Sequence, residues 1–540
     1  MTDSDPADGR APARAGHASR YAALSLAVAA VLYAVYLART DFHVLPPEDT
    51  VETVVAAREV AAGHGLTTRT TSPSVLTFLS RQGRAQPPWP SATRAPLPVL
   101  VMGGLMRVVS EPMAVALSSG IFFVLSVPLV FLIGYRLAGR AAGALGSAAY
   151  AISPAGLWYG VSGMSESGTI FSLSAIVYLL MGEITWGGCL LAGAAAGVGF
   201  LGRTTMKLWA PLIVGYILWR TRRRGAARSV GMAAAFLLPL LAAWLWFGLT
   251  MGGLTGQFGY FGQEDISIRR DTGLYPGRSS SLALESWSAR EFIMTHKTVV
   301  ARKYARIAEQ AWPALVKMGA LPFLVCFFLV ELFVVLSRGK RVTVHWLIYA
   351  LLVLQLLLVP LVSYGHGGVG ENRYLDPFGV VAAALGAAFA VELLRRYGTP
   401  LRRAALPMAG ILLLTSIPTL FDLAVGPYHA AAVWHWGQVG AYLEEHGTPD
   451  DVVASTHAGE TAWKSPMYSI GLPVTPEELV RMSAEMVPVD WVYIQPRPGD
   501  NAGRTTAWEP IIAGERELPG FALDHRFPDG AVLLRRTSAS

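Results

Sequence analysis

Long apolar runs recur along most of this chain, and they constrain its fold more than any other feature of the sequence. With 53% hydrophobic and only 15% charged residues, the chain is too apolar for an ordinary soluble protein. The pattern predicts an α-helical protein that crosses a membrane many times. The runs lie at 21–38, 97–109, 113–135, 141–160, 167–182, 185–201, 206–219, 229–251, 316–337, 344–364, 374–394 and 404–424.

Basic residues cluster between these runs and indicate the orientation of the chain, because cytoplasmic loops carry an excess of Lys and Arg. The clusters are Arg136 and Arg140; Arg220, Arg222, Arg223, Arg224 and Arg228; Arg338, Lys340 and Arg341; and Arg395, Arg396, Arg402 and Arg403. All of them are cytoplasmic if the run at 97–109, with only thirteen residues, lies in the interface instead of crossing. This arrangement predicts about eleven spans and a cytoplasmic N-terminus. We therefore expect a multi-pass protein of the bacterial inner (plasma) membrane.

The topology divides the chain into three parts. Residues 1–20 form a cytoplasmic tail, and 21–426 a transmembrane domain with outer loops at 39–112 and 252–317. After about residue 427 the composition changes to that of a small soluble unit, which predicts an α/β domain at 427–540 on the outer side. In this domain we expect helices over 433–446 and 475–486 and strands over 451–455, 489–494 and 531–536.

Charge and cysteine content narrow the function classes. The formal net charge of +7 reflects short basic clusters between apolar runs, which indicates loops and not a nucleic-acid surface. Cys189 and Cys326 are the only cysteines, each within an apolar run, so a disulfide framework is not expected. No metal-binding motif, P-loop or dinucleotide fingerprint is recognisable. We expect no cofactor, and the sequence leaves metal dependence open.

The outer face collects acidic residues in unusual places. The segment 45–66, the first polar sequence after the first span, carries Glu48 and Asp49 at the start of a helical pattern. Glu166 lies in a short turn between two apolar runs. Acids at helix starts are common caps, but ionisable groups at membrane depth are costly and are usually functional.

Cations gather on the same side. Arg203 and Lys207 interrupt a pair of apolar runs, and Arg373 opens a helix from its outer end. Arg58 and Arg94 lie in the first outer loop. Single basic residues near membrane ends usually snorkel to the interface, but this many outer cations are unexpected under the positive-inside rule. A ligand phosphate on this face would account for them.

Several short segments together resemble the GT-C superfamily of polyprenyl-phosphate-sugar-dependent glycosyltransferases, in particular the family of protein O-mannosyltransferases and lipid A aminoarabinose transferases. The resemblance covers nearly the whole chain through weak individual motifs. Two departures concern the acids: Thr50 follows Asp49 where the family has Glu, and Glu166 stands where the family usually has Asp. The matching segments are Asp49 with Ala57-Arg58 and Gly63-His64-Gly65-Leu66, Arg94-Ala95-Pro96-Leu97, Tyr135-Arg136-Leu137-Ala138-Gly139-Arg140, Ser153-Pro154 and Arg373-Tyr374.

The resemblance implies a GT-C-like fold and transfer of a sugar from a polyprenyl-phosphate donor to a glycan, lipid or protein acceptor at the outer face, with inversion. Asp49, or its neighbour Glu48, is then expected to be the general base, with Glu166 as its partner. Two alternatives stay open: a non-enzymatic binder or transporter of lipid-linked glycans, and a polymerase or ligase that uses a lipid-diphosphate donor. The implied lipid-phosphate ligands are Arg203, Lys207 and Arg373, followed by Arg58 and Arg94.

Overall fold

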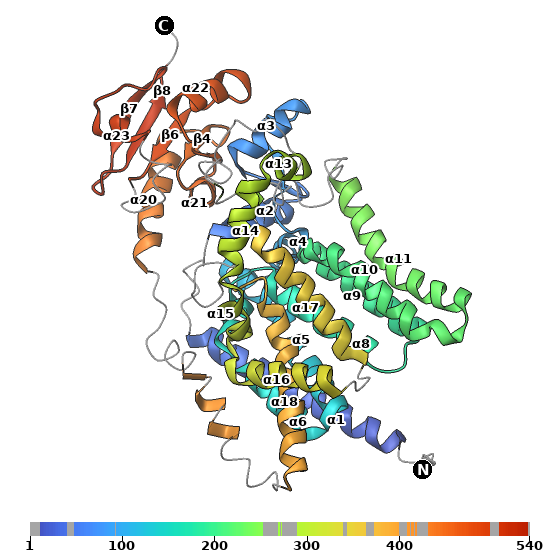
Figure 1. Ribbon diagram of the computed structural model, residues 1–540. Helices are drawn as coiled ribbons and strands as arrows, with labels where there is room; N and C mark the ends of the chain where they lie inside the picture. The colour runs from blue at the N-terminus through green and yellow to red at the C-terminus, as the bar shows by residue number, and fades with distance from the viewer. Residues whose placement is uncertain are drawn as a thin grey trace.

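The fold comes from a computed structural model that describes most of the chain. The described residues are 11–39, 48–91, 93–251, 268–269, 272, 289–338, 343–362, 372–398, 408–410, 412–414, 416–417, 430–496 and 507–537. The structure has two parts, a bundle of apolar helices and a smaller α/β unit at one end of it (Figure 1). The N-terminal end of α1 lies at the opposite end of the bundle (Figure 1).

Apolar helices make up the bundle. Among the described residues, five helices are long and apolar enough to cross a membrane, or up to six if one bent pair counts as a span. The chain is thus a multi-pass membrane protein, whereas the expected eleven spans stay a prediction. The helices are α1 (Ala11–Arg39), α4 (Pro96–Leu105), α5 (Glu111–Ala138), α6 (Arg140–Ala151), α7 (Pro154–Val161), α8 (Glu166–Leu180), α9 (Trp186–Gly202), α10 (Thr205–Thr221), α11 (Ala226–Thr250), α16 (Pro322–Arg338), α17 (Thr343–Val362) and α18 (Asp376–Arg396).

One expected span is broken into two helices. The apolar run at 141–160 contains Ser153-Pro154, where α6 has ended and α7 begins. The Ser153 hydroxyl caps α7 by accepting a hydrogen bond from the Gly156 backbone N–H at 3.0 Å. Proline lacks the N–H that an uninterrupted helix would need here, so a new helix starts at this point. Helix α7 then meets α8 at a bend of 117°.

Basic clusters meet at the end of the bundle away from the α/β unit. Arg136 donates to the Tyr178 carbonyl at 3.0 Å, and Arg220 donates to the Gly182 carbonyl at 3.0 Å. A Cβ on Gly139 would lie 3.4 Å from a guanidinium nitrogen of Arg395. Arginines from the ends of α5, α10 and α18 are therefore neighbours, as a shared side of the membrane requires. Lys340, Arg341, Arg402 and Arg403 fall outside the described residues.

Segments of the two loops that the sequence predicts on the outer side contact the bundle or the α/β unit. Helix α2 packs on α4 and carries the acidic segment of the first loop, and α14 packs on α17. The segments are α2 (Glu48–Ala61), β1 (Thr67–Thr68), β2 (Thr70–Thr71), α3 (Pro73–Arg81), β3 (Trp89–Pro90), α13 (Ala289–Thr295), α14 (Lys297–Ala308) and α15 (Ala311–Val316).

A mixed sheet forms the α/β unit, and one of its strands comes from the first loop. In the described residues the sheet has six strands in the order β2-β5-β4-β6-β8-β7. Strands β2, β5, β4 and β6 are parallel, whereas β8 pairs antiparallel with β6 and β7. The elements are α20 (Ala430–His446), β4 (Val452–Ser455), α21 (Ala458–Lys464), β5 (Tyr468–Gly471), α22 (Pro476–Glu485), β6 (Trp491–Ile494), α23 (Glu509–Ala513), β7 (Phe521–Arg526) and β8 (Val532–Arg536).

Candidate active site

The turn between α7 and α8 places Glu166 at the N-terminus of a buried helix. Gly163 has a φ of +70°, a conformation that glycine adopts without strain, and its backbone packs against the Thr50 and Val115 side chains. The Thr50 hydroxyl donates to the Ser162 carbonyl at 2.9 Å. The start of α2 is therefore held against this turn. The Glu166 side chain is only 2% exposed.

Arg203 forms an ion pair with Glu166. Arg203 is the C-cap residue of α9, and its Nη1 lies 2.7 Å from Oε1 of Glu166. The other oxygen, Oε2, is buried and has no hydrogen-bond partner among the described residues. A carboxylate accepts several hydrogen bonds, so an unused buried oxygen is costly unless a ligand or water supplies a donor.

Two guanidinium groups share one aromatic ring beside this pair. The guanidinium carbon of Arg203 lies 4.6 Å from the Tyr374 ring centroid, and that of Arg373 lies 5.5 Å away. Arg203 also donates to the Arg373 carbonyl at 3.4 Å. A ring face attracts cations, and Tyr374 thereby keeps two positive charges close together.

A cavity of about 290 Å³ opens at this cluster. Three arginines and a single glutamate, Arg94, Arg203, Arg373 and Glu166, are the charged residues that line it in the described part of the chain. The lining also includes apolar side chains, among them Pro98, Leu208, Leu358, Val359 and Leu361. A cavity lined by both cationic and apolar side chains fits a ligand that joins an anionic head to a hydrocarbon chain.

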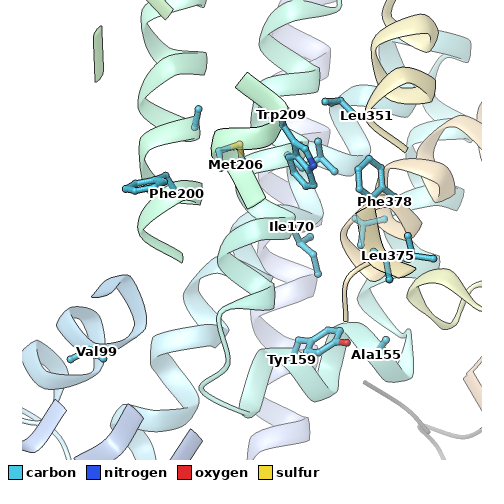
Figure 2. Packing of buried hydrophobic residues seen from close by; sticks show 14 of the residues in the cluster. Val99, Ala155, Tyr159, Ile170, Phe200, Met206, Trp209, Leu351, Leu375 and Phe378 are labelled. Atoms are coloured by element: carbon cyan, nitrogen blue, oxygen red, sulfur yellow. The ribbon is translucent and has the colours of Figure 1, made fainter. Parts of the chain in front are cut away.

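Side-chain contacts hold together the helices that contribute cavity residues. Trp209 of α10 stacks edge-on against Phe378 of α18, with ring centroids 5.2 Å apart, and Ile170 of α8 lies nearby (Figure 2). The Trp209 indole N–H donates to Oε1 of Gln355, a cavity residue on α17, at 3.1 Å. Large side chains in fixed contacts leave little freedom to the cavity residues on the same helices.

Helix α2 contributes one edge of the cavity. Thr53 lines it, and the neighbouring Glu52 accepts a hydrogen bond from Nε of Arg94 at 2.7 Å. The backbones of Glu48 and Asp49 begin this helix, one turn before Thr53. The side chains of Glu48 and Asp49 fall outside the described residues.

The structure separates the remaining candidates from the cavity. Lys207 lies on α10 but is absent from the cavity lining. Arg58 points away as well: its guanidinium binds Glu111 through two hydrogen bonds and the Trp463 carbonyl through a third. Arg94, Arg203, Arg373 and Glu166 are thus brought together, and Lys207 and Arg58 are not.

Sequence reasoning missed a buried acid behind the site. Asp376, the first residue of α18, accepts a hydrogen bond from the Tyr159 hydroxyl at 2.5 Å and one from the Gly319 N–H at 2.8 Å. Asp376 is 3% exposed. The sequence does point to Asp376 in one way, because it lies two residues after Arg373-Tyr374, at the start of a helix. Within the described ranges, no group of three or more His, Cys, Asp or Glu residues is placed to hold a metal ion.

Solved structures share this architecture at low sequence identity. ArnT from Cupriavidus metallidurans, solved with undecaprenyl phosphate, has a TM-score of 0.52 at 13% identity, and the match covers 96% of this chain and 99% of that one. The oligosaccharyltransferase AglB from Archaeoglobus fulgidus, in complex with an inhibitory peptide and a dolichol-phosphate, has a TM-score of 0.53 at 12% identity, covering 87% of this chain and 69% of that one. Arabinofuranosyltransferase AftD from Mycobacteria has a TM-score of 0.51 at 14% identity, with 96% and 40% covered.

Sequence-based comparisons give no match: no family model matches the chain, and neither does any curated protein. The likeness therefore lies in the three-dimensional arrangement, which extends over most of the chain. These structural neighbours are GT-C glycosyltransferases. The chain therefore has the GT-C glycosyltransferase fold, as the sequence resemblance predicted.

Proposed function

We propose that this protein is a membrane glycosyltransferase that moves a sugar from a polyprenyl-phosphate donor to a glycan, lipid or protein acceptor of the cell envelope. The observation that carries the proposal is the cavity whose lining combines Arg203, Arg373 and Glu166 with apolar side chains. ArnT and AglB, which share the fold, were solved with lipid phosphates. A lipid phosphate is the ligand that the cationic and the apolar residues of the cavity would suit together.

The reaction takes place on the outer side of the membrane in this proposal. The cavity lies among residues of the outer turns and loops, whereas arginines at the ends of α5, α10 and α18 gather at the other end of the bundle. The positive-inside rule places those arginines in the cytoplasm. An outer-face reaction also explains the lipid carrier, because soluble nucleotide sugars stay in the cytoplasm.

Arg203 and Arg373 are the proposed ligands of the donor phosphate, with Arg94 beside them. Arginine offers several N–H donors in a plane and binds phosphate oxygens in pairs. When the bond between the anomeric carbon and the phosphate oxygen breaks, negative charge builds up on the phosphate. Fixed guanidinium groups stabilise that charge more than the charge of the bound donor, which lowers the barrier.

The acceptor is activated by a carboxylate in the proposed mechanism. An acceptor hydroxyl attacks the anomeric carbon and the polyprenyl phosphate leaves, while the hydroxyl proton passes to the carboxylate. Asp49 is the proposed base, with Glu48 as the alternative, because α2 starts against the turn that carries Glu166. Glu166 orients the acceptor through its unused Oε2. A single displacement of this kind inverts the anomeric configuration.

A transfer assay tests the proposal. Purified full-length protein in nanodiscs is given radiolabelled lipid-linked sugars extracted from host membranes, together with host envelope fractions as acceptors. We expect transfer by the wild type and a loss of 10²- to 10⁴-fold, a range of about the size that general bases contribute, in Asp49→Asn. Glu48→Gln tests the alternative base. Asp450→Asn, which changes an exposed carboxylate of the α/β unit, is the matched control and should transfer normally.

The same assay separates the competing functions. A non-enzymatic binder would bind the labelled lipid without transferring sugar in any variant. Competition between undecaprenyl phosphate and undecaprenyl diphosphate tests for the other alternative, a polymerase or ligase with a lipid-diphosphate donor. Such an enzyme would be inhibited better by the diphosphate. Full transfer by both Asp49→Asn and Glu48→Gln would refute the assignment of the base.

A further inference from the structure

Arg58 joins three parts of the molecule that are far apart in the sequence. Its Nε and Nη2 donate to the two carboxylate oxygens of Glu111, at 2.6 and 2.9 Å, and its Nη1 donates to the Trp463 carbonyl at 2.7 Å. The Trp463 indole N–H closes the network by donating to Oε1 of Glu111 at 2.9 Å. Helix α2, the first residue of α5 and helix α21 of the α/β unit are thereby held together.

A strand of the first loop continues this connection. Strand β2 adds to the edge of the α/β sheet, where the Ser469 N–H donates to the Arg69 carbonyl at 2.7 Å. The Arg69 side chain binds Oε1 of Glu59 on α2 at 2.8 Å and also reaches the Pro466 carbonyl. The contact between loop and α/β unit therefore consists of backbone pairing and of side-chain hydrogen bonds.

Apolar contacts fill the space between α2 and α21. Val54 and Val55 of α2 form one buried cluster with Ala462 and Trp463 of α21. At the other end of this interface, a Cβ on Gly459 would lie 3.0 Å from Cγ of Glu52. A methyl group there would require the Glu52 side chain to shift by a few tenths of an ångström.

The interface leads directly to the cavity. Glu52 binds Arg94, which lines the cavity, and Thr53 lines it from the same helix. A shift of α2 relative to the bundle would therefore move Arg94 and Thr53. The start of α2 is tied to the Glu166 turn through Thr50, and its later turns are held by α4, by Arg107 and by Arg58 together with the α/β unit.

We propose that Arg58 is a positioning residue. It joins Glu111 to the backbone of α21, and through this connection the α/β unit holds α2, and the cavity residues attached to α2, in place. The α/β unit would then be a part of the site's framework and not only a module for the acceptor. The inference rests on the proposed function for its effect on lipid binding, but the contact itself does not depend on that function.

Hydrogen exchange and lipid binding of the full-length protein in nanodiscs test this proposal. Arg58→Gln should increase the exchange of α2 and β2 amides and weaken binding of undecaprenyl phosphate about tenfold, the size expected when charged hydrogen bonds are lost. Arg58→Lys, which keeps one charged donor, should recover part of the affinity. Glu111→Gln should cause a similar change, and the double variant should be little worse than either single one.

Arg107→Gln is the matched control, because Arg107 also binds α2, through the Val60 and Ala61 carbonyls, but is exposed and has no hydrogen bond to the described residues of the α/β unit. It should leave exchange in β2 and lipid affinity unchanged. Unaltered α2 exchange in Arg58→Gln would overturn the proposal. A lower unfolding temperature with unchanged affinity of the folded protein would overturn it too, since Arg58 would then serve stability alone. If the wild type does not bind undecaprenyl phosphate, the proposed function fails, and the exchange data still decide the role of Arg58.

Discussion

Two of the arginine–glutamate pairs in the described part of the chain differ in how many of their carboxylate oxygens accept a hydrogen bond. In the pair of Arg58 and Glu111, both carboxylate oxygens accept hydrogen bonds from Arg58. The remaining hydrogen bond of the Arg58 guanidinium goes to the Trp463 backbone carbonyl. In the pair of Arg203 and Glu166, one oxygen binds the arginine and the other has no partner among the described residues. A saturated pair holds helices together, whereas a pair with an unused buried oxygen beside a cavity is suited to a ligand.

Among the variants that compare these two pairs, removing the charge of Glu166 should have the largest effect. Glu166→Gln keeps the size of the side chain but loses the carboxylate, so transfer should fall by about 10²- to 10³-fold. Binding of undecaprenyl phosphate should not weaken, because Arg203 loses a competing anion. The assay is sugar transfer and lipid affinity on one preparation. Equal losses of transfer and affinity would contradict the distinction between the two pairs.

Arg373→Gln should weaken lipid binding more than it lowers the stability of the fold. Loss of one guanidinium beside the phosphate should weaken binding of undecaprenyl phosphate about 10- to 100-fold, since hydrogen bonds between charged groups contribute about 1.5–3 kcal/mol. The unfolding temperature should change little, because Arg373 is only half-buried and lies in the turn before α18. Arg107→Gln serves as the control for the loss of an outer-face arginine. An unchanged affinity would remove Arg373 from the phosphate site.

The pH dependence of stability tests the contacts that Glu59 makes between α2 and the rest of the first loop. Burial alone would raise the pKa of Glu59, but hydrogen bonds and charge from His64 and Arg69 lower it below its usual value. A carboxyl with a lowered pKa stabilises the fold above the unfolded pKa of about 4.3, and that stability is lost as the pH falls through the folded value.

We therefore expect the wild type to lose stability as the pH falls below the unfolded pKa of about 4.3 and through the lower folded pKa. Glu59→Gln should lower the free energy of unfolding at pH 7 by about 1–3 kcal/mol and flatten the profile in that window. Thermal unfolding in detergent at several pH values measures this. A variant with the wild-type profile would show that the pair of Glu59 and Arg69 contributes nothing.

A pair of glycines gives the smallest predicted effect. Gly459→Ala places a methyl group 3.0 Å from Glu52, so the α2 side of the cavity must move slightly, whereas Gly437→Ala meets nothing within 4 Å. Lipid affinity should fall a few-fold in Gly459→Ala, a loss of about 1 kcal/mol. Gly437→Ala should bind like the wild type. Identical affinities would mean that the contact between α21 and α2 does not reach the cavity.

The sequence could predict the fold and much of the cavity because these depend on local sequence features that are rare, such as charged residues within or next to apolar runs. Arg203, Arg373 and Glu166 interrupt or begin apolar helices, where a charge is costly without a purpose. Hydropathy and charge clusters set the order of the helices without long-range information. The break at Ser153-Pro154 was readable in the same way, but the length of the run at 141–160 favoured a single span.

Contacts between distant segments could not be predicted in this way. Strand β2 has only two residues, and its partner β5 lies almost four hundred positions later, so no periodicity indicates the pairing. Arg58 looked like the other outer cations, because its environment is created by Glu111 and the backbone of Trp463. Asp376 was missed because an acid at a helix start is also an ordinary cap.

One measurement tests the central claim most directly: the affinity of the purified protein for undecaprenyl phosphate, compared between the wild type, Arg203→Gln and Arg58→Lys. The claim predicts that the wild type binds, that Arg203→Gln loses at least tenfold in affinity, and that Arg58→Lys loses less than that. Equal affinities in the wild type and a folded Arg203→Gln variant would contradict it, because the lipid phosphate would then bind somewhere other than at the pair of Arg203 and Glu166.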